Sequence, residues 1–307
     1  MPDLHADLDR YGNLARVGYL ADLIEVHALA KQRPIRFATI ADAMKDADFK
    51  KRDLEILRDA QLADVSAEDE GNDDASEWLI AELRTRAQLL GVHYPFRLNQ
   101  DQIAPHKVAS QPYVEILGMT LAHAHPEVVS LPTGQVPSKD FEMTVHRFFE
   151  KEFCGRTFYT GSSRGQFSGL IASLRDKGFE AGVMGVRSKS ANDDGADSIA
   201  WCWEPDKRLG QITVVVQATV GRSETWCDKA SQVSPDRWKD HLGTGVPANA
   251  VLAVPHQLDQ LMLRRLVGAS SRPAVLDRSR LIRSSGAVQF GPYARAIANV
   301  RVDLFSQ

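Results

Sequence analysis

Several features that would place the chain in a specialised class are missing from its 307 residues. Its three cysteines, Cys154, Cys202 and Cys227, are far apart and lack C-x-x-C spacing. Neither a disulfide framework nor a zinc site is therefore expected. It has no signal peptide and no run of about 18 apolar residues, which favours a soluble cytoplasmic protein without membrane contact. The net charge of −3 supplies no overall basic field, so any nucleic-acid contact must come from a local patch.

A helical pattern dominates the first part of the chain. Apolar residues recur at three- and four-residue intervals from Leu14 to Ala30, and weaker helical patterns follow in IADAM and DLEILRDAQL. Three short helices followed by an extended piece fit a winged-helix-like module that contacts DNA or a partner. They also fit a plain helical packing domain. The lack of clustered arginine and lysine favours the packing domain.

Two breaks divide the chain. The acidic stretch at residues 66–77 is expected to be a solvated loop, with a helix from Trp78 to about Leu90 and another from Tyr113. Three prolines and a glycine at residues 126–140 predict a linker. At roughly 150 residues per domain, two domains are expected. We place a helical N-terminal domain at residues 1–130 and a second domain at residues 131–307.

The second domain alternates helical and strand-like segments. DFEMTVHRFFEKEF and GQFSGLIASLRDKGF have amphipathic helical patterns. Runs rich in valine and isoleucine follow in EAGVMGV, DSIAWCW, QITVVVQATV and VLAVP. Strands mixed with helices in this way predict an α/β fold.

Polar side chains converge at one edge of this predicted sheet. Asp197 opens one strand after an acidic glycine-containing loop, and the next strand ends in Gln217 and Thr219. Residues two apart on a strand face the same side, and a hairpin brings that side near Asp197. We expect these three residues to lie together. The alternative is that Asp197 is a turn residue and Gln217 only satisfies backbone groups.

The chemistry of phosphodiester hydrolysis fits such an edge. The reaction needs a hard divalent cation on oxygen ligands, an activated water and a cation near the phosphate. Nucleases of one large class place an Asp on one strand and (E/Q)-x-K on the next. Here Gln217 replaces the second acid and Thr219 stands where the lysine is expected. Lys229, at the start of a following helix, is long enough to reach back towards the site.

These residues resemble a bacterial family of restriction-endonuclease-like PD-(D/E)xK proteins that often occur near phage-defence genes. The resemblance covers motifs from about residue 80 to 281, and their order and spacing together carry it. They are Tyr94-Pro95-Phe96, YVEIL, Phe141-Glu142, the segment from Asp194 to Trp201, Gln217-Ala218-Thr219, Trp226 to Lys229, Ala253-Val254-Pro255 and LDRSRL at 276–281.

The resemblance implies a three-layer, mixed-sheet nuclease domain that cleaves DNA with Mg²⁺ or Mn²⁺. It implies Asp197 as principal metal ligand, Gln217 at the second-acid position, Lys229 as a displaced lysine and Glu142 as an accessory acid and metal ligand. Glu142 is equally compatible with a solvated helix residue. A role as an effector of anti-phage defence would fit, with an ATPase or sensor of a defence operon as partner and possible assembly into a homo-oligomer.

Two departures support a rival interpretation. Ala196 replaces a glycine of the family's loop, and the E-x-K lysine is missing. A nuclease-like fold that binds nucleic acid or assembles with a partner, without cutting, would have the same sequence pattern.

Other polar residues are weaker candidates. His123 and His125 form an H-x-H pair without nearby acids, and a metal role is not favoured. His146 lies one helical turn after Glu142 and faces either the same cleft or solvent. The loop of Ser162, Ser163, Arg164 and Gly165 is compatible with phosphate contact or with no role. Six arginines could contact a nucleic-acid backbone or form a salt-bridged surface: Arg264, Arg265, Arg272, Arg278, Arg280 and Arg283.

Overall fold

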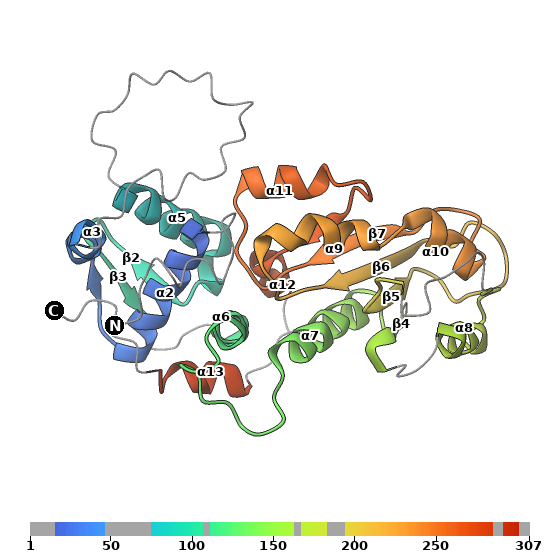
Figure 1. Cartoon of the computed structure of the whole chain (residues 1–307), viewed down its shortest axis with the longest axis horizontal. Helices are drawn as coiled ribbons and strands as arrows, with labels where there is room; N and C mark the ends of the chain where they lie inside the picture. Colours follow the sequence, from blue (N-terminus) through green and yellow to red (C-terminus); the bar gives the residue numbers. More distant parts are fainter. Residues whose placement is uncertain are drawn as a thin grey trace, which may run out of the picture.

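The computed structural model describes residues 16–46, 75–106, 111–162, 167–182, 194–284 and 291–300. The third helical pattern of the N-terminal part, most of the EAGVMGV segment and the tip of the 162–165 loop lie outside these ranges. Figure 1 shows the N-terminal helices packed beside a larger α/β part. Among the described helices, none has both the length and the apolar character that a membrane crossing needs.

The N-terminal part combines helices with a small antiparallel sheet. Its elements are α2 (Arg16–Lys31), β1 (Ile35–Arg36), α3 (Phe37–Asp46), α5 (Ala75–Leu90), the 3₁₀ turn η2 (Gly91–His93), β2 (Phe96–Leu98) and β3 (Gln102–Pro105). The strand order is β1-β3-β2, with both pairings antiparallel. Residues 47–74, between α3 and α5, lie outside the described ranges. Among the described elements, the order of helix, strand, helices and hairpin is compatible with the winged-helix alternative.

The central sheet has five strands within the described residues. They are β4 (Thr157–Tyr159), β5 (Ser198–Trp201), β6 (Thr213–Ala218), β7 (Asn249–Ala253) and β8 (Ala274–Leu276), in that spatial order. The pairs β4-β5 and β5-β6 are antiparallel, whereas β6-β7 and β7-β8 are parallel. The predicted α/β class with a mixed sheet is therefore confirmed.

Helices cover both faces of this sheet because successive strand residues point to opposite sides. The helices after the N-terminal part are α6 (Gln111–Ala124), α7 (Pro137–Glu152), α8 (Phe167–Asp176), α9 (Trp226–Gln232), α10 (Pro235–Leu242), α11 (Gln260–Val267), α12 (Arg278–Arg283) and α13 (Pro292–Ile297). Among them α7, α9, α11 and α12 contact strands of the sheet, whereas α6 and α13 pack on each other. On β6, Val216 belongs to the cluster formed with α7, whereas its neighbour Val215 belongs to the cluster formed with α8 and α10. The strands are apolar on both sides because both are buried.

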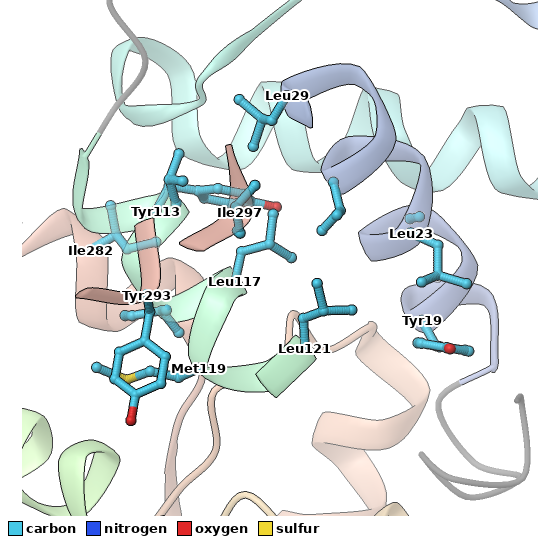
Figure 2. Packing of buried hydrophobic residues seen from close by; sticks show 14 of the residues in the cluster. Tyr19, Leu23, Leu29, Tyr113, Leu117, Met119, Leu121, Ile282, Tyr293 and Ile297 are labelled. Carbon is cyan, nitrogen blue, oxygen red and sulfur yellow. The ribbon is translucent and has the colours of Figure 1, made fainter. Parts of the chain in front are cut away.

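One hydrophobic cluster runs from the N-terminal helices to the near face of the sheet. Figure 2 shows its N-terminal portion, where Leu117 and Leu121 of α6 lie among side chains of α2, α12 and α13. The last helix, α13, packs against α6. A Cβ on Gly118 would lie 2.7 Å from the carbonyl oxygen of Tyr293, so this close approach requires a glycine.

Some boundaries differ from the expected ones. Helix α5 begins at Ala75, inside the expected acidic loop, and α7 begins at Pro137, inside the expected linker. Proline suits the first turn of a helix because its missing N–H would be unsatisfied there. The residues between α6 and α7 are irregular only up to Val136. Trp226 and Trp238 are fully buried, as expected of core residues.

Candidate active-site cleft

Asp197 and Gln217 are in direct contact at one end of the sheet. Gln217 Nε2 donates to Asp197 Oδ2 at 2.8 Å, and the backbone N–H of Ala218 donates to the same oxygen at 2.7 Å. Both side chains are buried. The backbone of Asp197 is fixed by Val216, which accepts its N–H, and by Thr160, whose N–H bonds to its carbonyl. The predicted convergence of these two residues is confirmed.

The turn before Asp197 is held by a second acid, Asp194. Its carboxylate accepts from Arg237 Nη1 at 2.7 Å and contacts His241 Nε2 at 2.8 Å, and its carbonyl accepts from Trp238 Nε1. Asp194 has a φ of 53°, and Gly195 follows with 78°. A Cβ on Gly195 would lie 3.0 Å from the backbone of Gln232. Left-handed backbone and close packing thus fix the loop that presents Asp197.

Glu142 reaches the same region from α7. The neighbouring stripe of this helix, with Phe141 and Val145, is buried in the core, and Glu142 is half-buried at the cleft. Tyr159 Oη of β4 donates to Glu142 Oε2 at 3.2 Å. Burial, together with the carboxylates of Glu142 and Asp197, raises the pKa of Tyr159 to about 12. The phenol therefore stays protonated at neutral pH and can act as a donor to Glu142.

Lys229 approaches from the other side on α9. The fully buried Trp226 anchors the start of this helix, and its Nε1 donates to the carbonyl of Gly221 at 2.9 Å. Lys229 follows one turn later and is half-buried. Its helix also packs against β7. The (E/Q)-x-K pattern does not predict Lys229, because the pattern expects the lysine on β6 and this lysine comes from a helix.

All four residues line a single cleft with a volume of about 670 Å³. Its lining combines Glu142 of α7, Asp197 before β5, Gln217 of β6 and Lys229 of α9. Thr219 lines it too, as its alternation with Gln217 predicted. Asp194, Arg237 and His123 also reach its wall. The cleft therefore holds three carboxylates beside a lysine and an arginine, a charge arrangement suited to a cation and a phosphate together.

The fit of a divalent cation can be tested on these groups. Gln217 Oε1 is buried and has no hydrogen-bond partner, and an unsatisfied buried acceptor costs about 1–3 kcal/mol. This amide oxygen and the carboxylate of Asp197 are the two hard donors that would hold such a cation. Within the described ranges, no three His, Cys, Asp or Glu side chains are grouped closely enough to enclose a metal. Mg²⁺ commonly binds one or two carboxylates and completes its shell with waters and substrate phosphate, so the set fits Mg²⁺ as an open site.

Other predicted candidates divide between the cleft and the core. His123 lines the cleft, and burial lowers its pKa. His125 is instead buried and stacked on Tyr19, with its Nε2 2.5 Å from the phenol oxygen. The H-x-H pair is therefore split, and no shared metal site forms. His146 Nδ1 lies 2.9 Å from Ser198 Oγ, and burial lowers its pKa as well.

The arginine run is not one surface. Arg264, Arg265, Arg272, Arg280 and Arg283 are exposed. Arg278 is fully buried, and its two terminal nitrogens bind the two carboxylate oxygens of Asp22 at 2.8 and 2.7 Å. Interpreting Arg278 as a backbone-contacting surface residue is therefore wrong. An arginine in a basic run gives no sequence signal that its partner lies 256 positions away.

Comparisons of the chain with protein-family models, with curated proteins and with solved structures found no match. The geometry of the cleft therefore carries the functional conclusion.

Proposed function

We propose that this protein is a Mg²⁺- or Mn²⁺-dependent nuclease that hydrolyses DNA phosphodiester bonds in the cleft, with a restriction-endonuclease-like PD-(D/E)xK fold. One observation carries the proposal. Four residues chosen by motif, spread over 88 positions from Glu142 to Lys229, line the same cleft, and Asp197 is hydrogen-bonded to Gln217. The five-stranded mixed sheet with helices on both faces supports the fold assignment.

The residues have distinct roles in this mechanism. Asp197 and the amide oxygen of Gln217 would hold the cation, and Glu142 would bind a second ion or a water. A bound divalent cation lowers the pKa of water and neutralises charge on the phosphate. Lys229 adds a positive charge for the phosphate or orients the attacking water. Arg237 is half-exposed and fixed by Asp194, so it presents a second cation at the cleft wall.

The test is cleavage of plasmid DNA with Mg²⁺ or Mn²⁺. Wild type should cut, and Asp197→Ala should be slower by at least about 100-fold, because metal binding contributes several kcal/mol to the transition state. Asp206→Ala, which removes an exposed acid in the β5–β6 turn, should cut as wild type does. Equal cutting by wild type and Asp197→Ala would refute the site. No cutting with either metal would refute the enzyme.

A second function has specific support. Thr219 occupies the position of the missing lysine, and Ala196 replaces a glycine of the loop before β5. Both features fit a nuclease-like module that binds nucleic acid or a partner without cutting. The same plasmid distinguishes the two functions, because the module would bind it in the presence of Mg²⁺ and leave it intact.

The wider biological role rests on the sequence resemblance. We propose that the nuclease acts in the bacterial cytoplasm as an effector of anti-phage defence, together with an ATPase or a sensor. Assembly into a homo-oligomer is part of the same proposal.

A further inference from the structure

A second cavity lies in the N-terminal part, between the end of α2, β1 and the start of α3. It has a volume of about 410 Å³ and is lined by His27, Lys31, Arg33, Pro34, Ile35, Arg36 and Thr39. No acidic residue is among these lining residues. The chain as a whole has a net charge of −3, so a cavity bordered by Lys31 and two arginines differs clearly from the average surface.

The positive charges of the two arginines are available to a ligand. Arg33 and Arg36 are both exposed, and within the described ranges neither guanidinium is paired with a carboxylate. Arg36 is fixed on β1, where it pairs in register with Gln102 of β3. A planar guanidinium on a fixed strand suits the paired oxygens of a phosphate.

The start of α3 adds a second source of positive potential. The first turn of this ten-residue helix has no acidic side chain, and Thr39 is exposed there. The N–H of Phe37 donates to the carbonyl oxygen of Asp101 at 2.7 Å, and the helix dipole still favours an anion at such an end. The helix start and the two guanidinium groups thus point to one class of ligand, an oxyanion.

The position of the cavity identifies the source of that oxyanion. In helix-turn-helix modules, the helix before the recognition helix crosses the nucleic-acid backbone. Helix α5 directly precedes the β2–β3 hairpin, which is the place of the recognition helix in a winged helix, and α3 is the described helix that comes before it. The exposed face of α5 has one arginine, Arg84, beside neutral and acidic residues such as Glu77. It is therefore poorly equipped to distinguish bases.

We propose that the basic cavity formed by Lys31, Arg33, Arg36 and Thr39 binds a backbone phosphate of DNA and holds the duplex without regard to sequence. The site lies outside the cleft and works without metal. It rests on the proposed function only in the choice of DNA as the nucleic acid. Phosphate contacts of this kind fix position and carry most of the salt dependence of binding.

The experiment measures binding of the full chain to a fluorescein-labelled 30-base-pair duplex by anisotropy, in EDTA, from 50 to 300 mM NaCl. Arg33→Gln with Arg36→Gln should raise Kd by about tenfold or more, because two charge-assisted hydrogen bonds are lost. The slope of log K against log salt should fall by about 1.8, or roughly 0.9 for each contact. The same changes should appear with a duplex of unrelated sequence.

The matched control is Lys207→Gln with Arg208→Gln. It removes the same two charges from an exposed turn between β5 and β6. Its salt slope should equal that of wild type. Each single variant, Arg33→Gln or Arg36→Gln, should lower the slope by about 0.9, which keeps the test open if the double variant folds poorly.

Three results would overturn the proposal. The first is a salt slope that is the same in the Arg33→Gln, Arg36→Gln double variant as in wild type. The second is an equal loss of affinity in the Lys207→Gln, Arg208→Gln control. The third is protection by millimolar inorganic phosphate in a thermal-shift assay without any effect of the arginine pair on duplex binding, which would indicate a small-anion site. Because binding is measured in EDTA, a failure of the proposed cleavage activity would not change the binding result. Conversely, if the protein cleaves DNA but the arginine variants bind the duplex as wild type does, only the phosphate-binding inference fails.

Discussion

Replacing Asp22 by asparagine should destabilise the whole protein. Asp22 of α2 is buried, and its two carboxylate oxygens receive Arg86 Nη1 at 2.6 Å and both terminal nitrogens of Arg278 at 2.8 and 2.7 Å. Burial alone would raise the pKa of Asp22, but Arg278 and Arg86 hold it at about 2. The carboxylate is thus charged and compensates two buried cations at neutral pH.

The magnitude follows from what the substitution leaves behind. Asparagine keeps one acceptor and turns an NH₂ group towards a guanidinium that also donates. Arg86 retains Glu82 and Glu25 at 2.8 and 3.1 Å. Arg278 retains only Glu25, at 4.0 Å, among described acids. Breaking a buried pair in this way costs about 3–5 kcal/mol. For a chain of this size, the melting temperature should fall by roughly 6 to 20 °C.

The assay is calorimetry at pH 7.5 on wild type, Asp22→Asn and the double variant Asp22→Asn with Arg278→Met. The double variant should melt above Asp22→Asn, because the uncompensated charge is gone. As a control, Asp206→Asn removes a partner of Arg208 on the surface and should melt with wild type, since exposed pairs contribute little. If Asp22→Asn melts within 2 °C of wild type, the reasoning about the buried network is wrong.

Three further predictions follow. Gln217→Glu should lower the melting temperature in EDTA, because two carboxylates would meet at about 3 Å, and millimolar Mg²⁺ should restore it; a variant indifferent to Mg²⁺ would count against the metal site. Burial, offset in part by Asp22, lowers the pKa of His256 from 6.5 to about 3, so its contribution is present above pH 6.5 and lost as pH falls towards 3. The free energy of unfolding of wild type in urea should therefore fall by up to about 5 kcal/mol from pH 6.5 to pH 3. The free energy of unfolding of His256→Gln should depend less on pH. Gly118→Ala should cost about 1–3 kcal/mol in the same urea assay, since its Cβ would collide with the backbone of Tyr293, whereas Gly169→Ala, in open space on α8, should not destabilise.

The sequence predicted which residues lie together at the cleft better than it predicted the buried polar contacts. Strand alternation placed Gln217 beside Asp197 because that relation is local to one hairpin. The roles of Tyr159 and Asp194 depend on pairs that form only in the folded chain, with Glu142, Arg237 and His241. Arg278 looked like a surface residue because its charge was visible and its partner in α2 was not.

The fold shows the same division. The helical patterns and valine-rich runs were sufficient for the α/β class, since periodicity reports burial directly. The two-residue strand β1 was missed, because a strand this short has no period, and with it a connectivity compatible with a winged helix. The linker expected at residues 126–140 is shorter than predicted, because Pro137 is the first residue of α7 and does not break the chain there.

The return of α13 to α6 has a consequence for how this protein can be divided or inherited. Helix α13 packs on α6, which precedes the sheet in the sequence (Figure 1). Arg278, which follows β8, binds Asp22 of α2. A truncated chain beginning near residue 131 would expose the apolar side of α13 and leave a guanidinium without its counter-ion. The two parts should therefore fold, be degraded and be exchanged between genomes as a single unit, and an isolated α/β fragment should be insoluble.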